Sequence, residues 1–377
     1  MKKRLGDYIQ EYSVRNKSGE DIPVYSITNS QGFCRDYFSK EVASKDKTSY
    51  KIVPRGCFAY NPSRINVGSV DWQRDEERVI VSPLYNVFSV SPEIDQQYLY
   101  YYLKSSATSY RIKEVATGSV RDNLRLSMLY DFMIELPSLD VQRQIVSNLD
   151  LLASIIRQRN QQLTKLDELI KARFVEMFGD MLLNSLEWPE KPLEGLADIV
   201  SGITKGRKTT ETGLIEVPYM AVSNVKSGYI DWTTIKTILA TKQEIEQYRL
   251  MPDDILMTEG GDPDKVGRGA IIKNPLKDSI HQNHIFRVRL DKSELLPAYF
   301  AEYLQHQKAK RYFLGCAKQT TGIASINMRQ LRALPVLIPP LPLQNQFADF
   351  VAEVDKSKLF AELFAQSTCI LAENRSK

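Results

Sequence analysis

The most constraining feature of the sequence is the segment from Leu136 to Asp180, which predicts one long helix near the middle of the 377-residue chain. No proline or glycine interrupts its body. Pro137 precedes it, Asp140 is the expected N-cap, and Gly179 is expected to end it. At 1.5 Å per residue the helix would span roughly 58 Å, which is too long for a helix within one small domain.

Apolar residues recur along this segment in steps of three and four, a spacing typical of a helix that pairs with another in a coiled coil. The alternative is an ordinary amphipathic helix in a helical domain. The expected partner begins after Pro342 and carries Phe347, Phe350, Val351 and Val354 on one side. The seam on the central helix comprises Leu149, Leu152, Ile156, Leu163, Leu166, Ile170 and Met177, with Arg159 and Arg173 on the same line.

The regions before and after the central helix share landmarks in the same order, which indicates an internal duplication. The offset between copies grows from about 195 to about 204 residues and then settles near 202. Two unrelated α/β domains with similar turns are the alternative. The matched landmarks are 22–29 with 217–224, 50–61 with 248–259, 67–68 with 266–267, 86–90 with 284–288, 98–103 with 298–304, 117–118 with 321–322, and 136–145 with 338–347.

Each copy is therefore expected to contain a globular α/β region followed by a helix. Segments 25–29 and 87–90 have the composition of strands, whereas 96–115 and 297–315 have helical spacing. Tyr98, Tyr101 and Tyr102 are expected to pack in the core rather than to stack on bases. The predicted boundaries are 1–136 for the first domain, 137–180 for the central helix, 181–338 for the second domain, and 339–377 for the C-terminal helix.

Composition bounds the class of protein without naming its partner. The net charge of +4 and the pI near 8.6 permit nucleic-acid binding but do not require it. No apolar run is long enough to span a membrane, and no signal peptide follows the basic N-terminus. The four cysteines lack CxxC spacing, which disfavours zinc clusters and disulfides. A cytoplasmic location is expected.

In this context, the sequence resembles the specificity subunits of type I restriction–modification systems. The matching segments are PSLDVQRQI (137–145), PPLPLQNQF (339–347), LDELIKARFVEMFGD (166–180) and TTGIASINMRQLRALPVLIPPL (320–341). The resemblance implies an α+β fold with two pseudo-repeated target-recognition domains, joined by two long antiparallel helices that form a coiled coil. The C-terminal segment departs from the family pattern after about Lys358. It ends LFAQSTCILAENRSK and does not resemble LDELIKARFVEMFGD.

The resemblance also implies function and partners. Such a subunit binds an asymmetric bipartite site on double-stranded DNA and is not itself catalytic. It assembles with two methyltransferase (M) subunits, which modify adenine at N6, and with restriction (R) motor–nuclease subunits. No cofactor is expected on this chain, whereas S-adenosylmethionine, ATP and Mg are expected on the partner subunits. A nucleoid-associated protein of a prokaryotic cytoplasm is implied.

The sequence lacks the motifs that catalysis would require. No NPPY-like tetrapeptide is present to hold a target base, since the nearest strings are NPSR (61–64) and NPLK (274–277). The segment 260–269 is rich in glycine but lacks the GK[ST] ending of a phosphate-binding loop, so a mobile loop is expected there. His281 and His284 lie three residues apart in a segment with strand character, and no metal site is expected there.

DNA contacts are expected in turn-rich loops that carry arginine, lysine and amide side chains, since these residues read base edges or anchor phosphates. The alternative for each candidate residue is a solvated surface side chain without a role in DNA binding. Trp72 and Trp232 are expected to anchor loops or pack in the core. The candidates are Asn61, Arg64, Asn66 and Arg74 (with Gln73 beside them) in the first copy, and Lys205, Arg207, Lys208, Lys265 and Arg268 in the second.

Two functions of other classes stay open at the level of sequence. One is an enzyme with a fused DNA-modifying activity, which a methylation assay on the chain alone would reveal. The other is a coiled-coil scaffold unrelated to DNA, which would show no salt-dependent DNA binding. Under the specificity-subunit hypothesis, the paired helices fix the spacer between two half-sites that differ because the two modules differ.

Overall fold

The computed structural model describes residues 2–35, 46–116, 123–206, 213–262, 265–320 and 322–375. By its contacts the chain divides into two compact units, residues 1–156 with 372–377 and residues 157–371. The division falls within the central helix, so that helix contributes to both units. The domain boundaries predicted from the sequence stay predictions.

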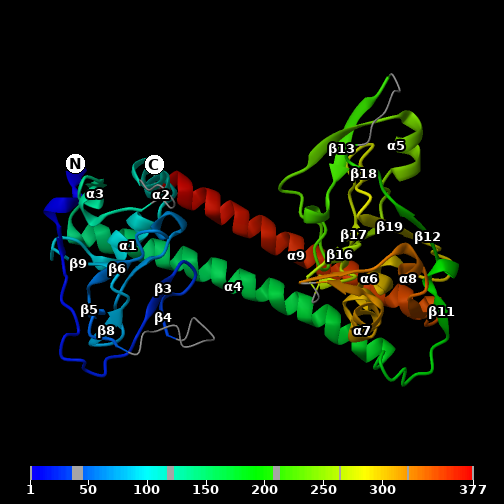
Figure 1. Ribbon diagram of the computed structural model, residues 1–377, viewed down its shortest axis with the longest axis horizontal. Coiled ribbons are helices and arrows are strands. Elements are labelled where there is room, and N and C mark those ends of the chain that lie inside the picture. Colours follow the sequence, from blue (N-terminus) through cyan, green and yellow to red (C-terminus); the bar gives the residue numbers. More distant parts are fainter. Residues whose placement is uncertain are drawn as a thin grey trace. The chain divides into compact units, whose positions relative to one another are not determined.

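The central helix is α4, which runs without a break from Leu139 to Phe178 (Figure 1). Its 40 residues correspond to about 60 Å. Gly179 ends it as predicted: its φ of 75° is left-handed, and its N–H donates to the Val175 carbonyl at 2.9 Å. The prediction of Asp140 as the N-cap is wrong. Because the helix starts at Leu139, Asp140 lies in the first turn. There its negative carboxylate interacts favourably with the positive end of the helix dipole.

In its described residues, the first unit consists of small antiparallel sheets with three short α-helices besides its part of α4. Its main sheet has the strand order β2-β9-β6-β7. Its elements are β1 (Lys2–Arg4), β2 (Ile9–Glu11), β3 (Ser26–Thr28), β4 (Gly32–Cys34), β5 (Lys51–Pro54), β6 (Phe58–Tyr60), β7 (Val70–Trp72), β8 (Arg78–Val81), β9 (Asn86–Val90), α1 (Gln96–Lys104), α2 (Ser106–Val115), α3 (Leu126–Tyr130) and β10 (Met133–Glu135).

The second unit has the same plan with additional strands. Its main sheet has the order β12-β19-β15-β17. Its elements are β11 (Glu190–Pro192), β12 (Ala197–Ser201), β13 (Ile215–Met220), β14 (Lys236–Ala240), α5 (Lys242–Tyr248), β15 (Asp254–Thr258), β16 (Gly260–Gly261), β17 (Gly269–Ile272), β18 (Ile280–His281), β19 (Ile285–Leu290), α6 (Pro297–Gln305), α7 (Gln307–Cys316), β20 (Lys318–Thr320), β21 (Ile323–Ser325), α8 (Met328–Arg332), β22 (Pro335–Leu337) and α9 (Leu341–Arg375).

The duplication predicted from the landmarks is confirmed by this topology. The two main sheets pair equivalent strands in the same order and all antiparallel. In each unit the first strand pairs with the strand that precedes the long helix, β1 with β10 and β11 with β22. The strands predicted at 25–29 and 87–90 correspond to β3 and β9.

The helical segments predicted at 96–115 and 297–315 are each two helices, broken at equivalent positions. Ser105 and His306 have extended backbones, with ψ of 151° and 154°. Each side chain then caps the following helix: the Ser105 hydroxyl accepts from the Thr108 N–H at 3.2 Å, and the His306 ring accepts from the Lys308 N–H at 3.3 Å. The sequence did not predict these breaks, because the apolar residues keep a helical spacing on both sides of each break.

The tyrosines of α1 pack mainly against the first unit's own core. Tyr98 and Tyr102 contact the main hydrophobic cluster, and their hydroxyls donate to the carbonyls of Glu135 and Met133 at 2.8 and 3.3 Å. Tyr101 instead donates to the Asp150 carboxylate on α4 at 2.5 Å, and burial raises its pKa to about 12. The expectation of packing rather than base stacking fits these contacts.

A buried glutamine joins each long helix to the module that precedes it. Gln142 and Gln344 are both fully buried. Gln142 Nε2 donates to the Glu93 and Pro137 carbonyls, each at 2.9 Å, and its Oε1 accepts from the Asp95 N–H at 2.9 Å. The bonds to Glu93 and Asp95 fix the start of α4 against the loop that leads into α1, and the bond to Pro137 holds the residues just before the helix.

Gln344 repeats the arrangement at the start of α9. Its Nε2 donates to the Glu294 and Pro339 carbonyls at 3.0 and 2.8 Å, and its Oε1 accepts from the Leu296 N–H at 2.8 Å. The two sequence segments noted as matching, 137–145 and 339–347, therefore match because each encodes the same buried amide clamp. None of the helices in the described part of the chain contains an apolar stretch that could span a membrane.

We predict that Gln344→Ala lowers the free energy of unfolding by about 3 kcal/mol, because it leaves two carbonyls and one N–H buried without partners. Urea unfolding of the full chain, followed by circular dichroism, measures the change. The matched control is Gln346→Ala on the same helix, an exposed position that should change stability by less than about 0.5 kcal/mol. Equal effects of the two substitutions would contradict the clamp.

Candidate nucleic-acid interface and helix pair

The first candidate loop lies between β6 and β7. Asn61 Oδ1 accepts from the Ser63 N–H at 3.0 Å, so this side chain shapes the turn. A short 3-10 helix then spans Ile65–Val67 and ends at Gly68, whose φ of 88° is left-handed. Arg64 is exposed, and no hydrogen bond or ion pair of its guanidinium is present among the residues described. Asn66 is half-buried.

Arg74 is held by the protein itself. Its guanidinium donates to both carboxylate oxygens of Asp71 at 3.0 and 3.3 Å, and it lies over the Trp72 ring at 4.5 Å from the centroid. Asp71 is buried and also accepts from the Phe33 N–H at 3.1 Å. Trp72 donates to Gln97 at 3.1 Å. This network ties β7 to β4 and α1, so it leaves Arg74 less available to DNA than Arg64.

The second candidate loop brings two of the predicted residues together. Lys265 and Arg268 both line one pocket of about 270 Å³, beside Lys226 and Lys310, which sequence reasoning missed. Lys265 forms an ion pair with Asp262. Lys205 is exposed in a separate turn. Arg207 and Lys208 lie outside the described residues. Only the fold reveals this pocket, because its four cations come from segments far apart in the sequence.

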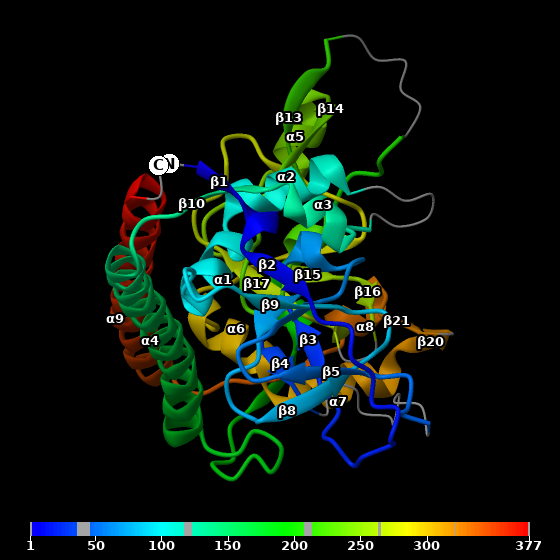
Figure 2. The same cartoon turned by 90° about the vertical axis from the view of Figure 1, so that its left-hand side faces the viewer.

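The two long helices pair through the core of the second unit. Asp167 on α4 meets Lys358 on α9 at 2.6 Å, whereas Phe174, later in α4, packs on Phe347, earlier in α9, with ring centroids 5.4 Å apart. The two helices are therefore antiparallel, as Figure 1 and Figure 2 also show. An antiparallel pair was predicted, and the fold class is confirmed.

The predicted seam is partly brought together. Leu166 and Ile170 join Phe347, Val351 and Val354 in one hydrophobic cluster of the second unit. By contrast, Leu149, Leu152, Ile156 and Leu163 are half-buried and do not belong to that cluster. The side chains of residues 361–375 on α9 lie outside the described part of the chain.

Sequence reasoning missed Phe174 and Phe178, the largest side chains that α4 buries. After Ile170 the fully buried positions advance in steps of four, through Phe174 to Phe178. The predicted seam residues Arg173 and Met177 are half-buried beside them: Arg173 lies over the Phe350 ring of α9, and Met177 packs against the same cluster. The apolar face of α4 is wider here than the predicted seam because α4 packs against α6 as well as α9: the Phe178 ring lies 4.8 Å from that of Tyr299 and 5.5 Å from that of Phe347. The spacing of four from Ile170 through Phe174 to Phe178 is present in the sequence and could have predicted that these phenylalanines are buried.

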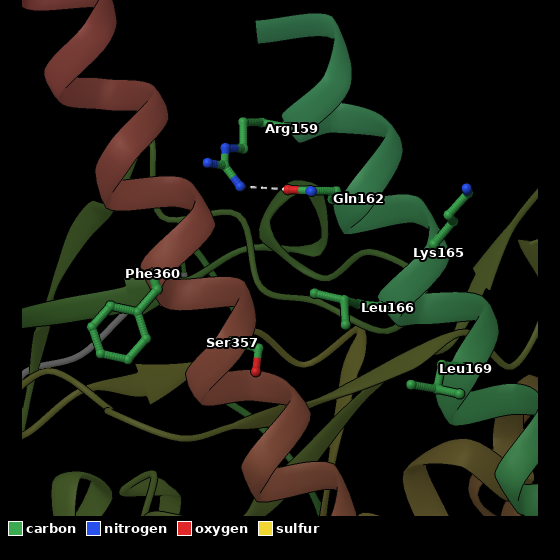
Figure 3. A pocket seen from close by; sticks show the side chains of 7 residues that line it. All are labelled: Arg159, Gln162, Lys165, Leu166, Leu169, Ser357 and Phe360. Carbon is green, nitrogen blue, oxygen red and sulfur yellow. Dashed lines mark hydrogen bonds between the residues drawn. The ribbon is translucent and has the colours of Figure 1, made fainter. Parts of the chain in front are cut away.

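At the edge of this cluster, residues of α4 and α9 line an open cavity of about 690 Å³ (Figure 3). Figure 3 shows Leu166 directed toward α9, while Phe360 points away from α4. Arg159 donates to Gln162 at 2.6 Å. Phe360 is 76% exposed and Leu169 is 47% exposed. The cavity thus presents apolar side chains beside basic ones. The lining residues are Arg159, Gln162, Lys165, Leu166, Leu169, Ser357 and Phe360.

The two neighbouring histidines have separate environments. His281 is fully buried, and its Nδ1 lies 3.1 Å from the Ile285 carbonyl oxygen. His284 is exposed, with Nδ1 2.5 Å from the Glu259 carboxylate. In the part of the chain that the structure describes, no group of three or more His, Cys, Asp or Glu side chains has the arrangement of a metal site.

Comparison with known protein families agrees with this architecture. Residues 6–165 and 185–363 match the type I restriction modification DNA specificity domain, once for each repeat. The chain belongs to this family. The resemblance inferred from the sequence is therefore confirmed, and the family supports neither a fused modifying enzyme nor a scaffold unrelated to DNA.

Two relatives match this chain over most of its length at low sequence identity. The EcoKI specificity subunit of Escherichia coli (strain K12) is 22% identical over 278 residues, covering 70% of this chain and 59% of that protein. The StySPI specificity subunit of Salmonella potsdam is 24% identical over 283 residues, covering 71% and 60%. The chain thus spans about 60% of the length of these curated relatives.

Solved structures share the fold. The crystal structure of a type I restriction–modification S subunit from M. genitalium superposes with a TM-score of 0.53 at 15% identity, over 99% of this chain and 94% of that one. A chain from a structural study of complex assembly and conformational transition in the type I R-M system gives a TM-score of 0.52 with the same identity and coverage.

We predict that the buried His281 makes stability pH-dependent. Burial lowers its pKa from 6.5 to about 4. The unfolded chain therefore takes up a proton below pH 6.5 that the folded chain excludes, so stability is present above pH 6.5 and is lost as the pH falls toward 4. Between pH 7.5 and 5.0 the loss should be about 2 kcal/mol.

Urea unfolding at the two pH values measures this loss. Carboxylates also titrate over this range, so the His281→Gln variant is the control: it should lose about 2 kcal/mol less than the wild type over the same interval. An identical pH dependence in both proteins would show that His281 is not responsible.

Proposed function

We propose that this chain is a DNA-recognition subunit of a type I restriction–modification complex, and that each module reads one half of a bipartite target. The observation that carries the proposal is the repeated sheet, β2-β9-β6-β7 and β12-β19-β15-β17, with different side chains in the equivalent loops. Equal folds with unequal loops suit two unequal half-sites. The target is therefore asymmetric.

The loops between equivalent strands supply the chemistry of recognition. Arg64 and Asn66 precede the left-handed Gly68 in the first module, and Lys265 and Arg268 flank the left-handed Gly267 in the second. An exposed arginine can pair with both acceptors of guanine, and an amide can pair with adenine, whereas lysine anchors phosphate. Asn61, Arg74 and Lys205 remain further candidates, of which Arg74 is the most restrained.

The long helices would set the spacer between half-sites and dock the partner subunits. Exposed apolar side chains on the helices, such as Leu169 and Phe360, support docking because such groups favour burial in an interface. The partners are two methyltransferase subunits and the restriction motor–nuclease subunits. S-adenosylmethionine, ATP and Mg belong to those partners, and this chain acts by binding and positioning without catalysis.

The test is genome-wide detection of N6-methyladenine in cells with and without this gene. The expected result is loss of a split, asymmetric motif with a fixed spacer on deletion. If no motif changes, co-expression with the neighbouring methyltransferase separates the explanations. Stable assembly without methylation would indicate a silent subunit, whereas failure to assemble would refute the proposal.

We predict that Arg64→Ala weakens recognition of one half-site only. Loss of a paired contact to a base should reduce affinity for the full target by about 5- to 150-fold and relax the preference at one base pair. Binding to targets altered in either half-site measures the effect. Arg15→Ala, another exposed arginine of the first module, is the control and should leave the preference unchanged.

The pattern of loss distinguishes the roles of Arg64. If Arg64→Ala weakens binding equally on every DNA sequence, the residue anchors phosphate instead of reading a base.

A further inference from the structure

A basic pocket of about 270 Å³ lies in the second module, between the loop after β13, the loop before β17 and the helices α6 and α7. Four cationic side chains from these separate segments meet there. Neutral groups complete the lining, including the phenol of Tyr229, which is 60% exposed. The cations are Lys226, Lys265, Arg268 and Lys310.

Among the residues that the structure describes, the positive charge of this pocket is only partly neutralised. Lys265 pairs with Asp262, and Lys226 lies 3.9 Å from Asp231. Within the described residues, Lys310 has no ion pair, and the buried Nε of Arg268 has no hydrogen-bond acceptor. The pKa of Asp262 is lowered, mainly by its hydrogen bond to Lys265 and to a smaller extent by the charge of Arg268. The positive charge of Arg268 therefore reaches the mouth of this loop. The remaining excess of charge favours an anion.

The equivalent positions of the first module carry no such charge. On the offsets that align the landmarks, Asn66 replaces Lys265, Ser69 replaces Arg268 and Ser109 replaces Lys310. The duplication has therefore kept the loop framework while three cations differ between the copies.

In the first module, a lysine side chain links the two equivalent loops. Lys104, at the end of α1, donates to the Gly68 carbonyl at 2.6 Å and to the carbonyl and side-chain oxygens of Asn29 at 2.9 and 3.1 Å. Burial lowers its pKa. This cation is satisfied by the protein's own oxygens and joins the two loops from within.

In the second module the equivalent residue is Gln305, a neutral side chain. Its Nε2 donates to the Gly269 carbonyl at 3.3 Å, and its Oε1 accepts from the Ser227 hydroxyl. Gln305 thus joins the same two loops without supplying charge. The cations here come from the rim of the pocket, where an external ligand can reach them.

We propose that this pocket binds a phosphate group of the DNA backbone next to the second half-site, and that the first module has no counterpart. The inference rests on the proposed function and deepens it. A phosphate oxygen can accept from the Arg268 guanidinium while the lysine ammonium groups neutralise its charge. The two modules then bind DNA differently: the second depends more on phosphate anchoring and therefore on salt.

The experiment uses the full chain assembled with its methyltransferase subunits and a duplex bearing the mapped target. Ethylation of single phosphates identifies those whose modification blocks binding. The variants are the Lys265→Gln/Arg268→Gln pair and, since Arg268 is half-buried, Lys310→Gln alone on the surface of α7. Lys277→Gln, an exposed lysine outside the pocket, is the matched control.

The expected result is interference at one or two phosphates beside the second half-site in the wild type, and loss of that interference in both pocket variants but not in the control. The slope of log affinity against log salt should fall by about 0.9 for each phosphate contact removed. Affinity should fall equally on targets with altered bases, since a phosphate contact carries no sequence information.

Other outcomes would overturn the inference. If the wild type binds DNA but the pocket variants keep every interference position, the pocket does not hold DNA phosphate. If inorganic phosphate raises the melting temperature of the wild type only, while interference is unchanged, the pocket binds free phosphate instead. If the wild type shows no salt-dependent DNA binding, the proposed function itself fails.

Discussion

Each long helix depends on one buried amide at its start. Gln142 and Gln344 satisfy three backbone groups apiece, and they do so at equivalent positions against equivalent loops. A buried amide tolerates no change of partner without leaving polar groups unpaired. The direction in which each helix leaves its module is therefore specified by hydrogen bonds as well as by apolar packing, which is less directional.

The modules themselves combine a conserved framework with divergent loops. Equivalent strands, the breaks at Ser105 and His306, and the left-handed glycines Gly68 and Gly267 recur in both copies. Gly267 in particular cannot gain a side chain, because a Cβ there would lie 2.1 Å from the Phe313 ring. The loops held by this framework differ in charge, as Asn66 and Lys265 illustrate. Recognition can thus change without loss of the fold.

The two copies also show how one structural need is met by two chemistries. A helix-end residue must join the loop after one strand to the loop before another. Lys104 does so with a half-buried ammonium and Gln305 with an amide. The choice has an electrostatic consequence, since the Lys104 charge is taken up by the protein's own oxygens, whereas Gln305 supplies no charge and the cations around it line a pocket. Such a difference gives two similar modules different dependence on salt.

The sequence by itself determined the duplication, the long central helix and its stop at Gly179, because periodicity and glycine conformation are local properties. The paired segments 137–145 and 339–347 were also visible, although their reason, the buried amides, was not. Only the tertiary structure decided that Phe174 and Phe178 occupy the core, that Arg74 is held by Asp71, and that Lys226 and Lys310 join Lys265 and Arg268. These facts depend on contacts between segments far apart in the chain, and no local pattern encodes such contacts.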